Sequence, residues 1–277
     1  MKLGCIVQAR MTSTRLPGKV MKTLDFKTGK TIIEEVIGRL QRVPQIDEII
    51  IATTENANDD VLVAEAEKLG VQAYRGSESD VLSRYYGAAV ESGLHEVIRI
   101  TSDCPFIDPQ VVSDLIEKFR GGNYDYASNA LKRTYPHGLD CEIFSMEVLE
   151  KVNSVAEDDF YREHVTSYIY THPDEFRLGS LELSGEDYSD LRITVDTVQD
   201  YTLSCVLKDM LGEEDTSYRS ILKLYEDKPY LKLINGDIVQ KKKYDSKKDE
   251  LEAAYRMLTK QEMERAAAII KQNLDEG

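Results

Sequence analysis

Short apolar runs alternate with amphipathic segments from residue 3 to residue 120. Apolar residues that recur every three or four positions predict helices, and short continuous apolar runs predict buried strands. The expected strands are residues 3–7, 46–53, 71–74 and 96–101, and the expected helices are residues 31–40, 59–69, 79–92 and 108–120. Units in this order form parallel βαβ repeats, with helices on both faces of the sheet. The pattern therefore predicts an α/β fold.

Residues at the expected helix ends support these boundaries. Gly70 stands just past a helical segment, where glycine readily adopts the left-handed backbone that ends a helix. Asp108 followed by Pro109 is typical of a helix start, since Asp caps free N–H groups and Pro suits the first helical position. Ser77 or Ser79 is the expected cap of the third helix.

The alternation loosens between about residues 124 and 190. Strand-like and helical pieces alternate there, at residues 124–127, 139–144, 146–152, 160–171 and 178–183. Insertions of this kind in an α/β fold often build a substrate pocket or a dimer arm, and we expect this one to do so. The run at 191–196 predicts a further strand with Asp196 at its carboxyl end, and a helix that ends near Leu211 follows.

The chain changes character near residue 240. Residues 1–240 form the predicted main domain, and residues 241–277 form a predicted helical extension. The extension opens with the basic run Lys241, Lys242 and Lys243 and continues with apolar residues at helical spacing, which predicts an amphipathic helix pair or one long helix. We expect it to pack on its own domain or across a dimer.

Composition and charge exclude several classes of protein. The chain has 35 Lys and Arg against 50 Asp and Glu, a formal net charge of −15, which argues against a general nucleic-acid binder. No stretch approaches the ~20 apolar residues of a membrane span, and the apolar run at the N-terminus is too short for a signal peptide. Four scattered cysteines without a C-x-x-C motif are expected to be buried thiols, as in a reducing compartment. We therefore expect a cytoplasmic protein without a membrane or nucleic-acid partner.

The most specific feature is a basic loop that follows the first expected strand. This loop, residues 8–19, holds three cations, Arg10, Arg15 and Lys19, with hydroxyl side chains and a Pro-Gly turn. Ligands of an open parallel sheet bind beyond the carboxyl ends of its strands, where these cations can neutralise a polyphosphate. The sequence lacks both the G-x-x-x-x-G-K-[ST] phosphate loop and the G-x-G-x-x-G dinucleotide motif. The loop therefore predicts a polyphosphate site of another kind, against the alternative of a solvated basic loop.

The loop sequence A-R-x-x-S-T-R-L-P-G-K, residues 9–19, resembles the signature of the CMP-sugar-acid synthetase family, especially of enzymes similar to CMP-KDO synthetase. It is most similar to the spore-coat-polysaccharide branch of the cytidylyltransferases, and the resemblance extends from residue 1 to about residue 235. It implies a Rossmann-like nucleotidyltransferase fold with a mixed, mostly parallel sheet, commonly in a homodimer. It also implies that CTP and a sugar acid give a CMP-sugar and pyrophosphate, in surface polysaccharide synthesis.

The resemblance assigns roles to individual residues of this sequence. The residues that it implies in nucleotide binding are Ala9, Arg10, Ser13, Thr14, Arg15, Lys19, Ser79 and Arg84. Arg15 and Lys19 are also implied in catalysis, together with Asp103. Ser79 and Arg84 lie in a segment similar to the one that approaches the cytosine and the ribose, and the alternative for Arg84 is a surface position on a helix.

Two aspartates at expected strand ends are candidate Mg²⁺ ligands. Asp103 follows the strand over 96–101 and faces the crevice of the basic loop, and Mg²⁺ often takes one or two carboxylates together with substrate phosphates. The alternatives are a turn residue for Asp103 and a helix cap for Asp196. The resemblance favours the metal for both, because CMP-KDO synthetases carry G-D-x-P at the first place, where Ser102 replaces Gly, and a V-D-T-like segment at the second. Asp200 is expected to be a first-turn helix carboxylate that the helix dipole favours.

Two further segments resemble the spore-coat branch and predict the acceptor pocket. Asp140 and Glu142 lie two positions apart, on one face of an expected strand, and could accept hydrogen bonds from sugar hydroxyls. Arg162 and His164 lie on an expected helix and could receive an anionic group. The alternative for His164 is a structural role.

The expected reaction is an in-line attack by an acceptor oxygen on the α-phosphate of CTP. Mg²⁺ held by Asp103 and Asp196 would bridge phosphate oxygens and orient the nucleophile, while Arg10, Arg15 and Lys19 would stabilise charge on the departing pyrophosphate. Two alternatives stay open: nucleotidyl transfer to a phosphorylated acceptor, such as a sugar phosphate or a polyol phosphate, and a non-catalytic nucleotide-binding scaffold that acts through partners. The preference for CTP over another nucleotide follows from the resemblance.

Overall fold

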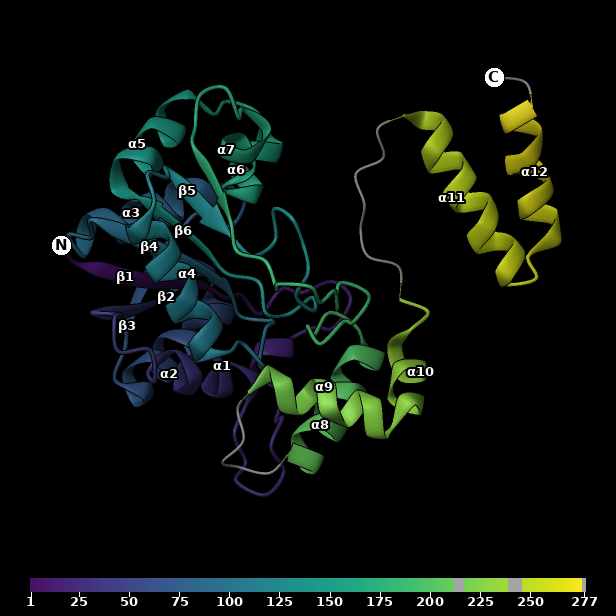
Figure 1. The fold of residues 1–277 in the computed structure, drawn as a ribbon, viewed down its shortest axis with the longest axis horizontal. Helices are drawn as coiled ribbons and strands as arrows, with labels where there is room; N and C mark the ends of the chain where they lie inside the picture. Colours follow the sequence, from purple (N-terminus) through teal and green to yellow (C-terminus); the bar gives the residue numbers. More distant parts are fainter. Residues whose placement is uncertain (212–216, 239–245, 276–277) are drawn as a thin grey trace. The chain divides into compact units, whose positions relative to one another are not determined.

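The computed structural model describes residues 1–211, 217–238 and 246–275 (Figure 1). The chain divides into two compact units, Met1–Gly236 and Asp237–Gly277. The boundary that the sequence predicts, at residue 240, and the basic run Lys241–Lys243 lie outside the described residues.

The described part of the first unit is built on a seven-stranded sheet with the order β3-β2-β1-β4-β6-β5-β7. The strands are β1 (Leu3–Gln8), β2 (Glu48–Thr54), β3 (Gln72–Gly76), β4 (Glu96–Thr101), β5 (Tyr126–Ser128), β6 (Glu142–Ser145) and β7 (Leu178–Ser180). Neighbouring strands from β3 to β4 are parallel, and so are β5 and β7, whereas β6 runs antiparallel to both β4 and β5. The predicted mixed, mostly parallel sheet is confirmed.

Helices cover both faces of this sheet (Figure 1). The core of one face includes side chains of α1 (Ile32–Leu40), α2 (Asp60–Leu69), α4 (Pro109–Gly121), α8 (Val198–Leu211) and α9 (Tyr218–Asp227). The core of the other face includes side chains of α3 (Val81–Glu91), α5 (Met146–Val155) and α7 (Ser167–Thr171). Along β1, Cys5 and Val7 belong to the first core and Ile6 to the second, as the alternation of a strand requires.

Local capping explains where several of these helices begin and end. The Thr31 hydroxyl accepts from the backbone N–H of Glu34, whose carboxylate accepts in return from the Thr31 N–H, so α1 starts at a capping box. Asp108 caps α4 and Gly70 ends α2 with φ 68°, as predicted. The predicted serine cap of α3 is wrong: Asp80 accepts from the Ser83 N–H, because the helix begins at Val81 and Asp80 is therefore its N-cap residue.

Two predictions for the second half of the chain need correction. The helix expected over residues 160–171 is broken into α6 (Asp159–His164) and α7 by Val165, which has φ 55° and ψ −65°. A β-branched residue adopts such a backbone only where its surroundings hold it, and the Val165 side chain is buried in the second core. The strand expected over 191–196 is also wrong. That segment forms an isolated bridge between Arg192 and His137. Further along it, the backbone N–H of Val195 donates to the carbonyl of Asp103, which lies in a loop.

The remaining short elements of the first unit are η1 (Lys19–Met21), η2 (Ala57–Asp59), η3 (Pro229–Leu231) and α10 (Lys232–Asn235). In the second unit, α11 (Lys247–Lys260) and α12 (Glu264–Asp275) form a helical pair, one of the two forms that the sequence allows. Ser246 caps α11, and Glu262 turns the chain between the helices with φ 57°. Among the described residues, no helix is both long and apolar enough to span a membrane.

Candidate active site

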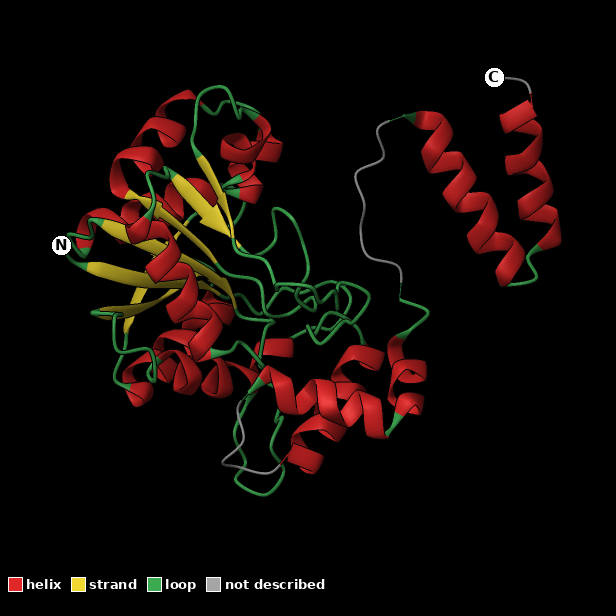
Figure 2. Cartoon of the chain, viewed as in Figure 1, coloured by secondary structure: helices red, strands yellow, loops and turns green. Residues whose placement is uncertain are grey.

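Loops gather at the carboxyl ends of the parallel strands (Figure 2). The basic loop leaves β1, and the segment with Asp103 leaves the neighbouring β4. The backbone N–H of Ser102 donates to the carbonyl of Gln8 at 3.2 Å and so extends the pairing of these two strands. The basic loop and Asp103, the first candidate metal ligand, therefore lie at the same end of the sheet, beyond the carboxyl ends of the strands, where open α/β sheets bind their ligands.

Lys19 lies between the two predicted metal ligands. Its Nζ is 2.8 Å from Oδ2 of Asp103 and 2.9 Å from Oδ1 of Asp196. Gly18 directs the chain inward with φ 64°, and its N–H closes the loop on the carbonyl of Met11 at 3.0 Å. Burial by itself would lower the pKa of the Lys19 ammonium, but the two carboxylates raise it above its ordinary value. The ammonium therefore stays charged between two carboxylates that are 93 residues apart in the sequence.

Asp196 is surrounded by cations. Nη2 of Arg15 lies 3.0 Å from its Oδ1, and Nη2 of Arg192 lies 2.8 Å from its Oδ2. Burial would raise the pKa of this carboxyl, but Lys19, Arg192 and Arg15 together lower it to about 2. Asp196 is therefore ionised at neutral pH.

Backbone bonds bring Asp103 and Asp196 together. The carbonyl of Asp103 accepts from the N–H of Val195 at 2.8 Å and from the hydroxyl of Thr194 at 3.0 Å. The carboxylate of Asp103 accepts from the Thr101 hydroxyl at 2.6 Å. These bonds hold residues 194–195 against the end of β4 and leave Asp196 beside Asp103.

A buried network that the sequence pattern did not predict lies behind Asp196. Asp200 does lie in the first turn of α8, as predicted, but it is 1% exposed and accepts from Nε of Arg192 at 3.0 Å and from Nδ2 of Asn235 at 2.9 Å. Burial would raise the pKa of Asp200, and the bonds from Arg192 and Asn235 lower it. The one available signal was the spacing of four residues from Arg192 to Asp196 and again to Asp200. No local pattern indicates Asn235.

The predicted nucleotide-binding residues occupy the edge formed by the ends of β1, β2 and β3. The predicted residue Ala9 extends β1, with its N–H bonded to the carbonyl of Ala52 at 3.1 Å. Arg10 lies 3.3 Å from Glu78, which also accepts from the Thr12 hydroxyl at 2.7 Å. Ser13 is half-buried, and its neighbour Thr14 is exposed like Arg15.

Arg84 is buried, so the alternative of a surface position on a helix is wrong. The residue is 3% exposed, and its Nη1 donates to the carbonyl of Ser77 at 2.7 Å. Burial, together with the nearby Arg10 cation, lowers the pKa of this guanidinium. The Ser79 hydroxyl lies 3.4 Å from that of Ser77 in the same segment. A buried cation beside a second cation suits an anionic ligand.

The predicted acceptor residues do not form one cluster of free side chains. Asp140 lies before β6, not on one face of a strand with Glu142 as predicted, because the strand begins only at Glu142. Asp140 forms an ion pair with Arg133 and accepts from the Gly138 N–H at 2.8 Å. Glu142 forms an ion pair with Arg99.

Glu142 also connects β6 to the turn at Val165. Its carboxylate accepts from the hydroxyls of Tyr126, at 2.8 Å, and of Thr166. Arg162 forks onto Asp80, with Nε and Nη2 at 2.9 and 2.6 Å from its two oxygens, and so joins α6 to the cap of α3. His164 is exposed, and its ring lies 4.6 Å from that of Phe160.

A tight loop joins the Asp140 region to the segment that carries Asp196. The backbone of His137 bonds to Leu191 at 2.9 Å and to Ile193 at 2.7 Å. Gly138 has φ 108°, and a Cβ atom at this position would lie 2.6 Å from the backbone nitrogen of Thr194, so only glycine fits. Burial and the Arg133 cation lower the pKa of His137 to about 4, so its imidazole is neutral at neutral pH.

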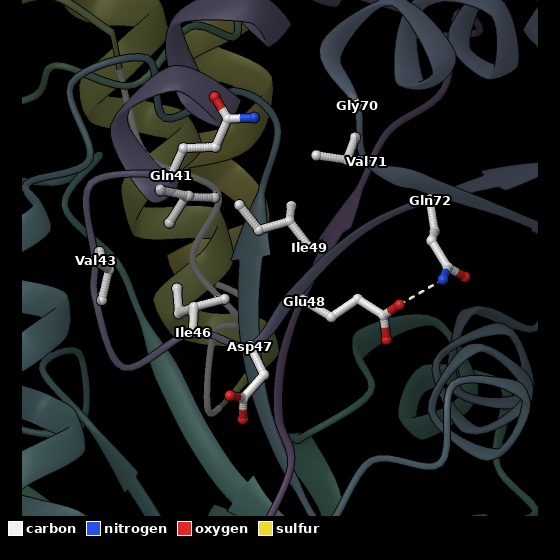
Figure 3. A pocket seen from close by; sticks show the side chains of 10 residues that line it. Gln41, Val43, Ile46, Asp47, Glu48, Ile49, Gly70, Val71 and Gln72 are labelled. Atoms are coloured by element: carbon white, nitrogen blue, oxygen red, sulfur yellow. Dashed lines mark hydrogen bonds between the residues drawn. The ribbon is translucent and has the colours of Figure 1, made fainter.

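A hollow of about 390 Å³ lies at the opposite end of the sheet, beside the amino ends of β2 and β3 (Figure 3). It is lined by residues from the end of α1 to the start of β2, and by Gly70, Val71 and Gln72. Its charged lining residues are Asp47 and Glu48, and Glu48 accepts from Gln72. An acidic hollow at the amino ends of the strands has the wrong charge and place for a polyphosphate.

Comparison with known proteins gives consistent matches. A family model described as Cytidylyltransferase matches residues 4–263. The uncharacterized protein MJ1063 of Methanocaldococcus jannaschii is 34% identical over 245 residues, which are 87% of this chain and 97% of that protein. The spore coat polysaccharide biosynthesis protein SpsF of Bacillus subtilis is 33% identical over 233 residues, 81% of this chain and 94% of that protein. A solved cytidylyltransferase structure from Leptospira borgpetersenii superposes with a TM-score of 0.79 at 30% identity, and covers 88% of this chain and 99% of that one.

Proposed function

Because the chain belongs to the cytidylyltransferase family, and is therefore a nucleotidyltransferase, we propose that it transfers CMP from CTP to a sugar acid or a related carbohydrate, with Mg²⁺ as cofactor and pyrophosphate as the second product. The observation that carries this proposal is the convergence of Asp103 and Asp196 on one ammonium, that of Lys19, beside Arg15. Two carboxylates and two cations from segments far apart in the sequence meet there.

The donor set of this centre suits Mg²⁺. Asp103 and Asp196 offer carboxylate oxygens, the ligands that Mg²⁺ takes when substrate phosphates complete its coordination. Both are half-buried, and one positive charge already sits between them. A bound Mg²⁺ would supply charge neutralisation and polarisation at the phosphate oxygens.

The cations of the basic loop provide the electrostatic part of the reaction. The acceptor hydroxyl oxygen attacks the α-phosphorus and loses its proton to solvent, a P–O bond forms, and the bond from the α-phosphorus to the bridging oxygen of pyrophosphate breaks. Arg10, Arg15 and Lys19 supply positive charge for the charge that develops on pyrophosphate. Ala9, Ser13, Thr14, Ser79 and Arg84 complete the proposed nucleotide site, and Arg84 brings a buried cation to it.

The acceptor pocket of the proposal includes Asp140, Glu142, Arg162 and His164. Support for Asp140 comes from the His137–Gly138 loop, which packs on residues 193–194 just before Asp196. The acceptor class rests on the resemblance of the basic loop to CMP-sugar-acid synthetases, and the pathway, surface polysaccharide synthesis, rests on the similarity to SpsF. We place the enzyme in the cytoplasm, in agreement with its four free cysteines, and expect a homodimer in sedimentation experiments.

Pyrophosphate release tests the proposal. Each nucleoside triphosphate is combined, with Mg²⁺, with panels of sugar acids, sugar phosphates and small phosphorylated acids. We expect release that requires CTP and one acceptor class and that is lost on Asp103→Ala. A product with a diphosphate linkage would assign a phosphorylated acceptor instead. CTP binding without release from any pair would contradict the proposal and favour a non-catalytic scaffold.

A further inference from the structure

The two oxygens of the Asp196 carboxylate have different partners. Oδ1 faces the basic loop, with Lys19 Nζ at 2.9 Å and Arg15 Nη2 at 3.0 Å. Oδ2 faces the opposite way and accepts from Nη2 of Arg192 at 2.8 Å. Lys19 and Arg15 belong to a glycine-containing loop at the proposed substrate edge, whereas Arg192 is buried behind the carboxylate.

Arg192 is itself held in place from behind. Its Nε lies 3.0 Å from Oδ1 of Asp200, and its Nη2 lies 3.1 Å from Oδ2 of the same carboxylate. One planar guanidinium therefore joins Asp196 to Asp200, and its forked donors determine the direction in which Asp196 points.

Asp200 cannot move without breaking a saturated set of bonds. Its Oδ2 also accepts from the backbone N–H groups of Asp196, at 3.1 Å, and Thr197, at 3.0 Å. Nδ2 of Asn235 donates to Asp200 Oδ1 at 2.9 Å and to the carbonyl of Arg192 at 3.0 Å. Asn235 comes from α10, so a distant part of the first unit completes the support of this carboxylate.

We propose that Arg192 is a positioning residue for Asp196, that Asp200 and Asn235 support it, and that together they present Oδ1 alone to a divalent cation. This inference rests on the proposed function, because it assigns the orientation of one carboxylate in the proposed cation site. Residues that orient the ligands of a metal in this way commonly change metal affinity by about 10–100-fold when they are replaced.

The test measures binding of Mn²⁺, alone and with CTP, by the electron paramagnetic resonance signal of the free ion. Arg192→Lys keeps the charge but loses the fork, and we expect it to weaken binding about tenfold or more. Asn235→Ala removes one support and is expected to weaken binding less. Arg177→Lys is the matched control, because Arg177 forks onto Asp125, at 2.9 and 2.7 Å, at the edge of the sheet. We expect the control to bind Mn²⁺ like the unaltered protein.

A double-variant cycle separates positioning from a structural role. If Arg192 acts through Asp196, then Arg192→Lys adds no further loss of Mn²⁺ affinity once Asp196→Asn is present. A structural role would lower the thermal unfolding temperature of every variant and leave Mn²⁺ affinity unchanged.

Folded Arg192→Lys and Asn235→Ala proteins that both bind Mn²⁺ with unaltered affinity would overturn the inference while the proposed function stands. If the unaltered protein binds no Mn²⁺, with or without CTP, the proposed cation site fails and this inference fails with it. A folded Asn235→Ala protein with weakened binding supports the inference even where Arg192→Lys does not fold.

Discussion

Two regions of the molecule contain carboxylates paired with cations, but the pairing differs between them. The first is the shared centre formed by Lys19, Asp103 and Asp196, and the second is the region of Asp140 and Glu142. Asp103 and Asp196 share one ammonium, and Asp196 also pairs with two arginines, Arg15 and Arg192. Asp140 and Glu142 each have an arginine of their own, Arg133 and Arg99. An ammonium shared by two carboxylates can be replaced by another cation without rearranging the chain. A carboxylate with its own arginine, here called a private pair, is held in one position by that arginine. The first arrangement suits exchange of cations, and the second suits recognition of a shape.

The largest effect is expected from removing a carboxylate of the shared centre. Asp103→Asn keeps the size of the side chain and should lower the rate of pyrophosphate release about 10³-fold, because the charge at the proposed cation site is halved. Single-turnover kinetics with CTP measure the effect. Asp209→Asn is the control, since Asp209 is exposed and pairs with Lys27. Equal rates of pyrophosphate release in the two variants would show that Asp103 takes no part in the reaction.

Lys19→Met tests whether the centre exchanges its cation. Without the ammonium, two carboxylates face each other, and the free energy of unfolding should fall by about 2 kcal/mol. Added Mg²⁺ should restore stability more in this variant than in the unaltered protein, because ligand binding to the folded state raises that free energy. Urea unfolding with and without Mg²⁺ gives both values. Arg133→Met, in the private pair, should lose stability that Mg²⁺ does not restore, and equal restoration in both variants would contradict the distinction.

The pH dependence of stability should report the cations around Asp196. Its folded pKa, about 2, is lowered from the ordinary value of 3.8, so its contribution is fully present above pH 3.8 and is lost as the pH falls through 2. The shift corresponds to about 2 kcal/mol. We therefore expect the free energy of unfolding to fall less between pH 4 and pH 2 in Asp196→Asn than in the unaltered protein. Parallel curves for the two proteins would show that Asp196 contributes nothing in this range.

The smallest effect is expected in the acceptor region. Asp140→Asn should raise the KM of the acceptor about tenfold, which corresponds to about 1.4 kcal/mol, without changing the KM of CTP. Steady-state kinetics with each substrate varied in turn separate the two. Glu182→Gln serves as a control, because Glu182 pairs with Lys132 outside the proposed site. If Asp140→Asn raises the KM of CTP instead, Asp140 belongs to the nucleotide site and not to the acceptor pocket.

Prediction from the sequence succeeded where the signal was local. The first four strands, the caps at Asp108 and Gly70, and the basic loop at the end of β1 follow from neighbouring residues. It failed at Val165 and over residues 191–196, where the backbone conformation depends on distant partners. The extended run at 191–196 has strand-like residues, but its bonds go to His137 and Asp103 in loops and not to a neighbouring strand.

The sequence by itself determined the α/β architecture of this protein and the place of the basic loop, because hydrophobic periodicity and turn chemistry act over a few residues. Only the tertiary structure decided which charges meet. Lys19, Asp103 and Asp196 come from three segments far apart in the sequence, and Asn235 reaches Asp200 from another helix. Their meeting depends on backbone bonds such as that from Val195 to Asp103. Electrostatic interactions depend on distances in space, and the sequence does not report those distances for residues as far apart along the chain as Lys19, Asp103 and Asp196.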